Sequence, residues 1–133
     1  MNIQLIDKKM LSELHAQAIG SERKRMHLDL RNTQDDNSQR MLNALEPGTN
    51  IPIHRHEDTS ETVICIEGSL EWVFYEISPN DGFKEIDRYR ICPREGSWGI
   101  QVPKGMWHSV EVYDPSVIFE AKDGKYVSAN TKP

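Results

Sequence analysis

The sequence lacks the features of secreted, membrane and nucleic-acid-binding proteins. Its 133 residues include two cysteines, Cys65 and Cys92, too few for a disulfide framework. No apolar run is long enough to cross a bilayer, and residues 1–10 lack the apolar core of a signal peptide. The net charge of -5 opposes binding to a phosphate backbone. We therefore expect a cytoplasmic protein without nucleic-acid or membrane partners.

The length and the spacing of turn signals predict one all-β domain. Residues 7–19 predict a short amphipathic helix between a plausible N-cap, Asp7, and a stop at Gly20. Strands are expected at 24–31, 39–45, 62–68, 69–77, 83–91, 98–102, 107–113 and 116–122, with a turn at Asp114-Pro115 before the last. This pattern indicates an antiparallel sandwich or small barrel, with a helical segment 1–22 packed on a domain 23–133.

The most informative stretch is residues 48–68. His54 and His56 are separated by one residue, so their side chains point the same way on a strand. Glu61 follows, and a turn at 57–60 would bring its carboxylate back to the imidazoles. Imidazole and carboxylate ligands suit iron, manganese, nickel, cobalt or zinc and do not choose among them. The stretch therefore predicts a site for one divalent transition metal.

The spacing of this stretch resembles the first motif of the cupin superfamily, in which glycines flank a His-x-His pair and a glutamate. Every interval of that motif is met by Gly48, His54, His56, Glu61 and Gly68. The resemblance implies a cupin jelly-roll barrel, also called a double-stranded β-helix.

A second cupin motif follows downstream. It is matched by Gly96, Pro103, Gly105 and His108, with one extra residue between Gly96 and Pro103. Val112 stands where an asparagine is often found, so nothing that depends on that amide carries over. By resemblance, the metal ligands are His54, His56, Glu61 and His108.

Further features resemble one cupin subgroup, the WbuC-type cupin-fold metalloproteins. They are the arginine-rich segment 23–27, the run 38–45, Pro52, and the ending 119–126. That subgroup is associated with surface-polysaccharide biosynthesis in bacteria. The resemblance implies a metal site with a small, sugar-derived ligand.

Most proton-transfer chemistry at a metal needs an acid or base nearby. The candidates are Arg25, His27, Glu120, Lys122 and Tyr126. Glu120 and Lys122 share one face of the last predicted strand. Inside the barrel they would serve as base and anion anchor, and outside it they would be an ordinary surface pair. Arg25 would hold a substrate carboxylate or phosphate through its planar fork.

Other residues are assigned to packing. Trp72, Trp98 and Trp107 are expected in the core, with the alternative that one walls the pocket for a sugar ring. Cys65 is expected to be a small buried residue, and His15 a surface or packing residue.

Three functions fit these observations. The first is a metal-dependent isomerase, epimerase or lyase, the second an iron(II) dioxygenase-type cupin, and the third a non-catalytic sugar-binding module. Polar residues beside the metal would favour an enzyme, and a wholly apolar pocket would favour binding alone. A homodimer is expected because a jelly roll of this length leaves strand edges to cover.

Overall fold

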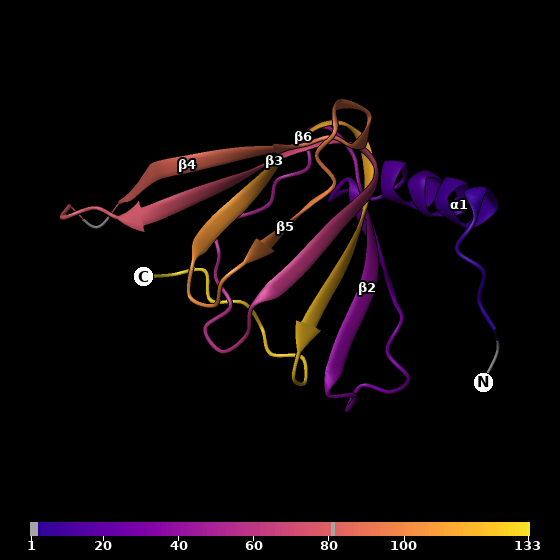
Figure 1. Ribbon diagram of the computed structural model, residues 1–133, viewed down its shortest axis with the longest axis horizontal. Coiled ribbons are helices and arrows are strands. Elements are labelled where there is room, and N and C mark those ends of the chain that lie inside the picture. Colours follow the sequence, from indigo (N-terminus) through magenta and orange to yellow (C-terminus); the bar gives the residue numbers. More distant parts are fainter. Residues whose placement is uncertain (1–2, 81) are drawn as a thin grey trace.

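A computed structural model of the chain describes residues 3–80 and 82–133. Within these residues the chain forms one α-helix, one short 3-10 helix and six strands (Figure 1). In chain order they are α1 (Lys8–Ile19), β1 (Arg25–Asp29), β2 (Ser38–Leu45), β3 (Glu61–Ile77), β4 (Phe83–Ile91), η1 (Pro93–Glu95), β5 (Gly99–Val102) and β6 (Trp107–Asp123). The predicted all-β fold with a short N-terminal helix is confirmed.

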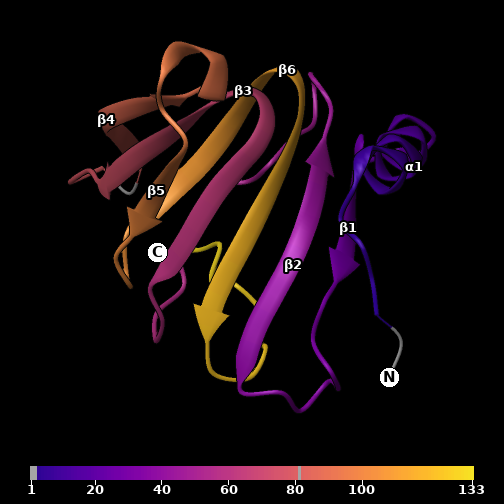
Figure 2. The ribbon, with the colours of Figure 1, turned by 45° about the vertical axis from the view of Figure 1, so that its right-hand side comes forward.

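The strands form one antiparallel sheet in the order β1-β2-β6-β3-β4, and β5 pairs with the first part of β3. β3 and β6, each 17 residues long, lie side by side along most of their lengths (Figure 2). The sheet curls around an interior apolar cluster. Its buried members are Leu45, Val63, Cys65, Leu70, Trp72, Phe74, Ile91, Val102, Val110 and Ile118.

The predicted strand breaks inside β3 and β6 are wrong. The ranges 62–68 and 69–77 belong to one strand, and so do 107–113 and 116–122, so Asp114-Pro115 does not turn the chain away. A proline removes one ladder donor and is tolerated where pairing is irregular. The register between β3 and β6 shifts beside Pro115, where Ser69 pairs with Asp114 and Glu67 pairs with Val117.

Gly68 lies at this irregularity and changes which face of β3 points inward. Its φ is +110°, and a Cβ there would lie 2.6 Å from the Cα of Ser116. Odd-numbered residues face the interior before Gly68 (Glu61, Val63, Cys65), and even-numbered residues do so after it (Leu70, Trp72, Phe74). The motif glycine therefore lets one strand serve both halves of the barrel.

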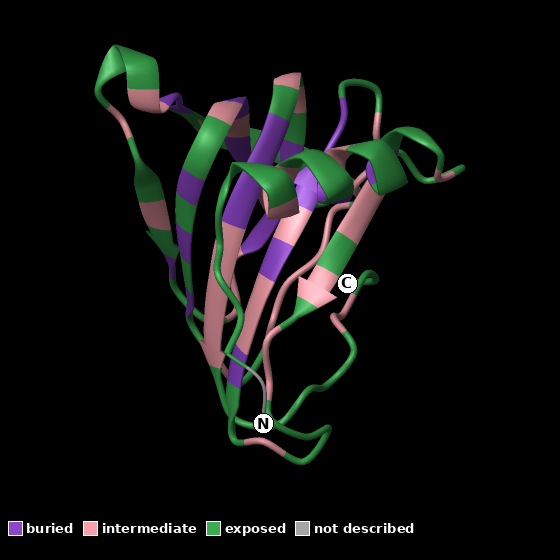
Figure 3. Cartoon of the chain, turned by 90° about the vertical axis from the view of Figure 1, so that its right-hand side faces the viewer, coloured by how far each residue is buried: buried purple, intermediate pink, exposed green. Residues whose placement is uncertain are grey.

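A second apolar cluster lies on the outer face of the sheet, under α1 (Figure 3). Leu14 and Ala18 of the helix pack there with Leu42, Ala44 and Val117. The predicted helix ends are confirmed: the N–H of Met10 donates to Asp7 Oδ1 at 3.0 Å, and the cap at Gly20 closes on carbonyls of the last turn. His15 adds a polar anchor, because its Nε2 lies 2.7 Å from Glu67 Oε1.

Two of the three tryptophans lie in the core as predicted. Trp72 and Trp107 are 1% and 5% exposed, whereas Trp98 is 60% exposed, so the prediction for Trp98 is wrong. Trp98 immediately precedes β5, and its side chain lies at the surface, whereas Ile100 of that strand is partly buried and Val102 is buried.

Candidate metal centre

Three histidines from two distant segments meet inside the barrel. The His54 N–H donates to the carbonyl of His108 at 2.9 Å, and the His108 N–H donates back at 2.8 Å. This antiparallel bridge fixes the segment around His54 and His56 beside β6. One ring nitrogen of each of the three histidines lies within 4.8 Å of the other two. The structure thus brings together the three predicted imidazole ligands.

Backbone carbonyls orient two of the imidazoles. His54 Nδ1 lies 2.9 Å from the carbonyl oxygen of Pro52, and His108 Nδ1 lies 2.8 Å from that of Met106. A carbonyl only accepts, so each Nδ1 carries the proton and each Nε2 keeps its lone pair. Ligating histidines in metal sites are held by this kind of support.

Burial keeps the imidazoles of His54 and His56 neutral, the form that binds a metal. Desolvation is the main reason that the pKa of His54 falls to about 4, with the neighbouring His108 adding to the shift. Desolvation likewise lowers the pKa of His56 to about 4, and the charge of Lys122 contributes. At neutral pH both rings therefore present unprotonated nitrogens without further cost.

Glu61 faces the same space from the first residue of β3. Its Oε2 lies 3.7 Å from His56 Nε2, and its Oε1 lies 3.8 Å from His108 Nε2. The side chain is 4% exposed, so the carboxylate is held between two imidazoles away from water. The three histidines form a cluster that could hold a divalent transition metal, and the Glu61 carboxylate lies beside it.

The last part of β6 carries the predicted acid–base pair to the same place. Glu61 is the register partner of Lys122, whose Nζ lies 3.5 Å from Glu61 Oε2. Glu120, two residues earlier, points to the same face. Burial, followed by the charge of Glu61, raises the pKa of Glu120 to about 7 against the opposing effects of Lys122, Asn43 and Arg25. Both residues therefore lie inside the barrel, next to the histidine cluster.

The remaining candidates lie at the β1 edge of the sheet. Arg25 and His27 share the inward-pointing face of β1, and Glu120 acts electrostatically on Arg25. Tyr126 is 58% exposed in the tail, with the Arg31 guanidinium 6.0 Å from its ring centre. The structure thus brings Arg25 near the polar interior and leaves Tyr126 at its outer margin.

Sequence reasoning missed the support that the C-terminal tail gives to the site. Asn130 and Arg55 exchange backbone hydrogen bonds of 2.9 and 3.0 Å, so the tail pairs with the residue between His54 and His56. The Arg55 guanidinium also lies 4.5 Å from the ring centre of Trp107, the neighbour of His108. A cavity of about 280 Å³ separates His56 from this tail. The only signal in the sequence was the position of Arg55 in the His-x-His motif.

A second hollow, of about 320 Å³, opens on the other side of the histidines. Its lining is largely apolar and includes Phe74, Ile100 and Met106. The ring of Phe74 lies 6.1 Å from that of His108. The interior is therefore asymmetric, with a polar side toward β1 and β2 and an apolar side toward β4 and β5.

Solved structures with the same architecture belong to cupin-fold proteins. An oxalate oxidase in complex with the substrate analogue glycolate matches with a TM-score of 0.60 and 14% identity, over 84% of this chain and 56% of that chain. A cupin 2 domain-containing protein from Halorhodospira halophila matches with a TM-score of 0.56 and 15% identity, over 86% and 74%. KdgF from Halomonas sp. matches with a TM-score of 0.58 and 14% identity, over 77% and 80%.

These similarities establish the fold: the chain is a cupin barrel with a three-histidine cluster in its interior. Within that class, a family described as a domain of unknown function (DUF6016) matches residues 6–81, and the chain belongs to this family. No curated protein matches the sequence. The chain spans 56% of the oxalate oxidase that it resembles.

Among residues 3–80 and 82–133, no helix is long and apolar enough to cross a membrane.

Proposed function

We propose that this cupin is a metal-dependent enzyme that acts on a small polar or sugar-derived metabolite, as an isomerase, epimerase or lyase. The observation that carries the proposal is the placement of Glu120 and Lys122 beside Glu61, on the inner face next to the histidines. A binding module needs no buried acid–base pair at its metal. The resemblance to the WbuC-type cupins supports a metabolite of surface-polysaccharide biosynthesis.

Each residue of the site has a chemical role in this proposal. A divalent metal held by the three histidines and Glu61 would supply Lewis-acid polarisation of substrate oxygens. Glu120 holds or accepts the proton that the substrate exchanges, because a carboxyl group with a pKa of about 7 serves as either acid or base at neutral pH. Lys122 offers an ammonium group to developing negative charge and keeps Glu61 oriented.

An iron(II)-dependent oxygen-consuming enzyme is the second candidate. The observation in its favour is the shared fold with an oxalate oxidase described in complex with glycolate, although the two chains are only 14% identical. The non-catalytic sugar-binding module ranks third, because its expected signature is an apolar pocket and one side of this interior is charged.

Metal analysis tests the proposal first. The protein would be purified without oxygen or chelator and analysed for transition metals, with His56→Ala as the site variant and His27→Ala as an exposed histidine control. We expect one equivalent of a single metal in the native chain and in the control, and none in His56→Ala. Iron would direct the assays to dioxygen chemistry; manganese, nickel, cobalt or zinc would direct them to isomerases and epimerases.

A native protein that takes up no metal after reconstitution would overturn the proposal. With metal present, Glu120→Gln separates catalysis from binding. The variant should keep its metal and lose turnover by about 100-fold or more, the usual contribution of a general acid or base. Unchanged turnover would remove Glu120 from the mechanism.

The expected homodimer and cytoplasmic location complete the proposal. Both cysteines are buried and free, which suits a reducing compartment. Light scattering at micromolar concentration tests the assembly, and a monomeric mass would contradict the homodimer.

A further inference from the structure

The β1 edge of the barrel contains two adjoining hollows with a shared polar lining. One, of about 240 Å³, is lined by Ser21, Arg23, Arg25, Met26, His27 and Asn43. The other, of about 400 Å³, shares Arg23, His27 and Asn43 and adds Asp29, Arg31, Met41 and Tyr126. We call the two together the basic mouth. Three arginines and one histidine line it, against a single carboxylate.

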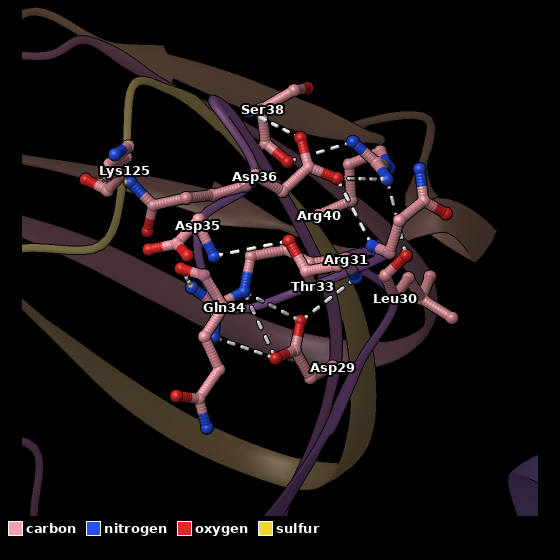
Figure 4. A network of polar contacts seen from close by, with 12 residues as sticks. Asp29, Leu30, Arg31, Thr33, Gln34, Asp35, Asp36, Ser38, Arg40 and Lys125 are labelled. Carbon is pink, nitrogen blue, oxygen red and sulfur yellow. Dashed lines mark hydrogen bonds and ion pairs between the residues drawn. The ribbon is translucent and has the colours of Figure 1, made fainter.

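The single carboxylate of the basic mouth is already paired. Asp29 receives three hydrogen bonds of 2.8 to 3.0 Å from the Arg31 side chain. Figure 4 shows this pair inside a wider network in which Asp36 contacts Arg40. The charges of Arg31 and Asp29 therefore cancel locally, and the uncompensated positive charge of the mouth resides on the other two arginines.

Arg23 and Arg25 have few partners. Among residues 3–80 and 82–133, neither guanidinium takes part in an ion pair. The hydrogen bond recorded for the Arg25 side chain is from Nη1 to the carbonyl of Asn50 at 3.3 Å. Burial and repulsion from Arg23 lower the pKa of Arg25, with Glu120 opposing. An anion between the two guanidiniums would relieve this repulsion and accept charge-assisted hydrogen bonds.

Asn43 adds a second kind of contact. Its Oδ1 is buried and has no hydrogen-bond partner within the described chain. A buried acceptor without a partner is costly and suits a ligand hydroxyl, which can donate to it. The basic mouth thus offers cationic donors to an oxyanion and one acceptor to a neighbouring hydroxyl group.

Glu120 connects the basic mouth to the neighbourhood of Glu61 along the inner face of the sheet. Across the strands, Asp29 of the mouth pairs with Met41, Met41 with Glu120, and Glu120 with Val63, two residues from Glu61. β1 is three strand spacings from β3, roughly 14 Å across the sheet. Glu120 therefore lies between the two sites, within electrostatic range of both Arg25 and Glu61.

We propose that the basic mouth binds the phosphate or carboxylate group of an acidic sugar, whose hydroxyl-bearing end extends toward the histidine cluster. The link to the metal rests on the proposed function. The anion site itself rests on Arg23, Arg25, His27 and Asn43. The substrate class is thereby narrowed from polar metabolites to hydroxylated anions.

Calorimetric titration at low ionic strength tests this inference with three probes: inorganic phosphate, glucose 6-phosphate and gluconate. The full-length protein with its native metal is compared with Arg25→Gln, Arg23→Gln and the control Arg90→Gln, an arginine paired with Glu95 on the surface. Arg25→Gln and Arg23→Gln should each lower the affinity for the anion that binds tightest by about tenfold or more, the usual effect of losing a charged hydrogen bond. Arg90→Gln should leave the affinity for all three probes unchanged.

Two further arms separate the anion site from the metal. His56→Ala, expected to lack metal, should still bind inorganic phosphate, because the mouth does not depend on the ion. Phosphate binding that is lost in His56→Ala and unchanged in Arg25→Gln would place the anion on the metal and overturn the inference. If the native protein contains no metal and its phosphate binding depends on Arg25, the anion site would be supported and the proposed function would be contradicted.

The probes also distinguish the anionic group. Tighter binding of glucose 6-phosphate than of gluconate would show that the basic mouth recognises a phosphate group, and the reverse order would show that it recognises a carboxylate. The absence of millimolar binding by all three probes would overturn the inference. If Arg25→Gln fails to fold, Arg23→Gln decides the outcome, because within residues 3–80 and 82–133 the Arg23 side chain makes no hydrogen bond or ion pair that the substitution would break.

Discussion

Strands β3 and β6 contribute to two charge clusters of opposite character, one of which also includes Glu85 and Arg88 of β4. The inner charge cluster (Glu61, Glu120, Lys122) lies on the barrel side of β3 and β6, where two carboxylates share one ammonium. The outer charge cluster lies on the solvent side and centres on Arg88, which contacts Glu71, Glu85 and Glu111. Outside, Arg88 lowers the pKa of Glu111; inside, burial raises that of Glu120. Both clusters carry more carboxylates than cations, but water screens the excess negative charge of the outer cluster, whereas the buried excess of the inner cluster is left for a metal or ligand to offset.

The largest contrast is expected from removing the cation of each cluster. In metal-free protein, Lys122→Met should lower the free energy of unfolding by about 3 kcal/mol, because it leaves buried carboxylates without a partner. Arg88→Met should cost under about 1 kcal/mol, since its ion pairs are exposed to solvent and screened. Urea unfolding measures both. Equal losses in the free energy of unfolding for the two variants would show that the buried cation stabilises the protein no more than the exposed one.

Of the two charge clusters, only the inner one should affect metal retention. Glu61→Gln should weaken metal binding by about tenfold or more, because an amide oxygen carries no charge to offset the ion. The control Glu71→Gln alters the outer cluster on the same strand. Competition with a coloured chelator compares the two variants with the native chain, and an equal affinity of Glu61→Gln would exclude Glu61 as a ligand.

The titration of Glu120 is the next contrast. In metal-free protein its carboxyl group should titrate near pH 7 by carbon-13 NMR, well above the ordinary value of 4.5. Its pKa is raised by folding, so its contribution to stability is present below pH 4.5 and is lost as the pH rises through about 7. Glu120→Gln should therefore gain stability relative to the native chain between pH 5 and pH 8. No relative gain would contradict the assigned burial.

The smallest effect is expected at the surface pair of Arg90 and Glu95. Two hydrogen bonds from Arg90, of 2.9 and 2.8 Å, lower the pKa of Glu95 to about 2. This pKa is depressed by folding, so the small stabilisation is present above the ordinary value and is lost as the pH falls toward 2. Arg90→Gln should return the NMR midpoint of Glu95 toward 4.5. A midpoint that stays near 2 would assign the shift to another group.

The residues that meet at the candidate metal centre could be predicted from the sequence because local strand geometry and motif spacing determine them. The alternation of a strand places His54 and His56 on one side, and the cupin-like spacing adds Glu61 and His108. The structure brings the three histidines and Glu61 to one place. Long-range contacts could not be anticipated in this way: the Arg55–Asn130 pairing joins the motif to the tail, and nothing local in the sequence encodes it.

The sequence does not decide which way Glu120 and Lys122 point, because Ile118 and Phe119 are adjacent and both apolar. A continuous β6 resolves it. His108, Glu120 and Lys122 all have even numbers, so an unbroken strand carries them on one face. The same counting fails for β3, because the irregularity at Gly68 reverses its alternation. The parity of a long strand therefore depends on bulges, which tertiary packing decides.

The long pairing of β3 with β6 also determines when the site can exist. Glu61 meets Lys122 and His54 meets His108 across the intervening chain, and the backbone of Arg55 pairs with that of Asn130. The three histidines therefore cannot meet until the chain has been synthesised through His108 and has folded back onto His54. Such non-local contacts slow folding, since the intervening loop must be closed before they form. Metal capture would then report that β3 and β6 have paired.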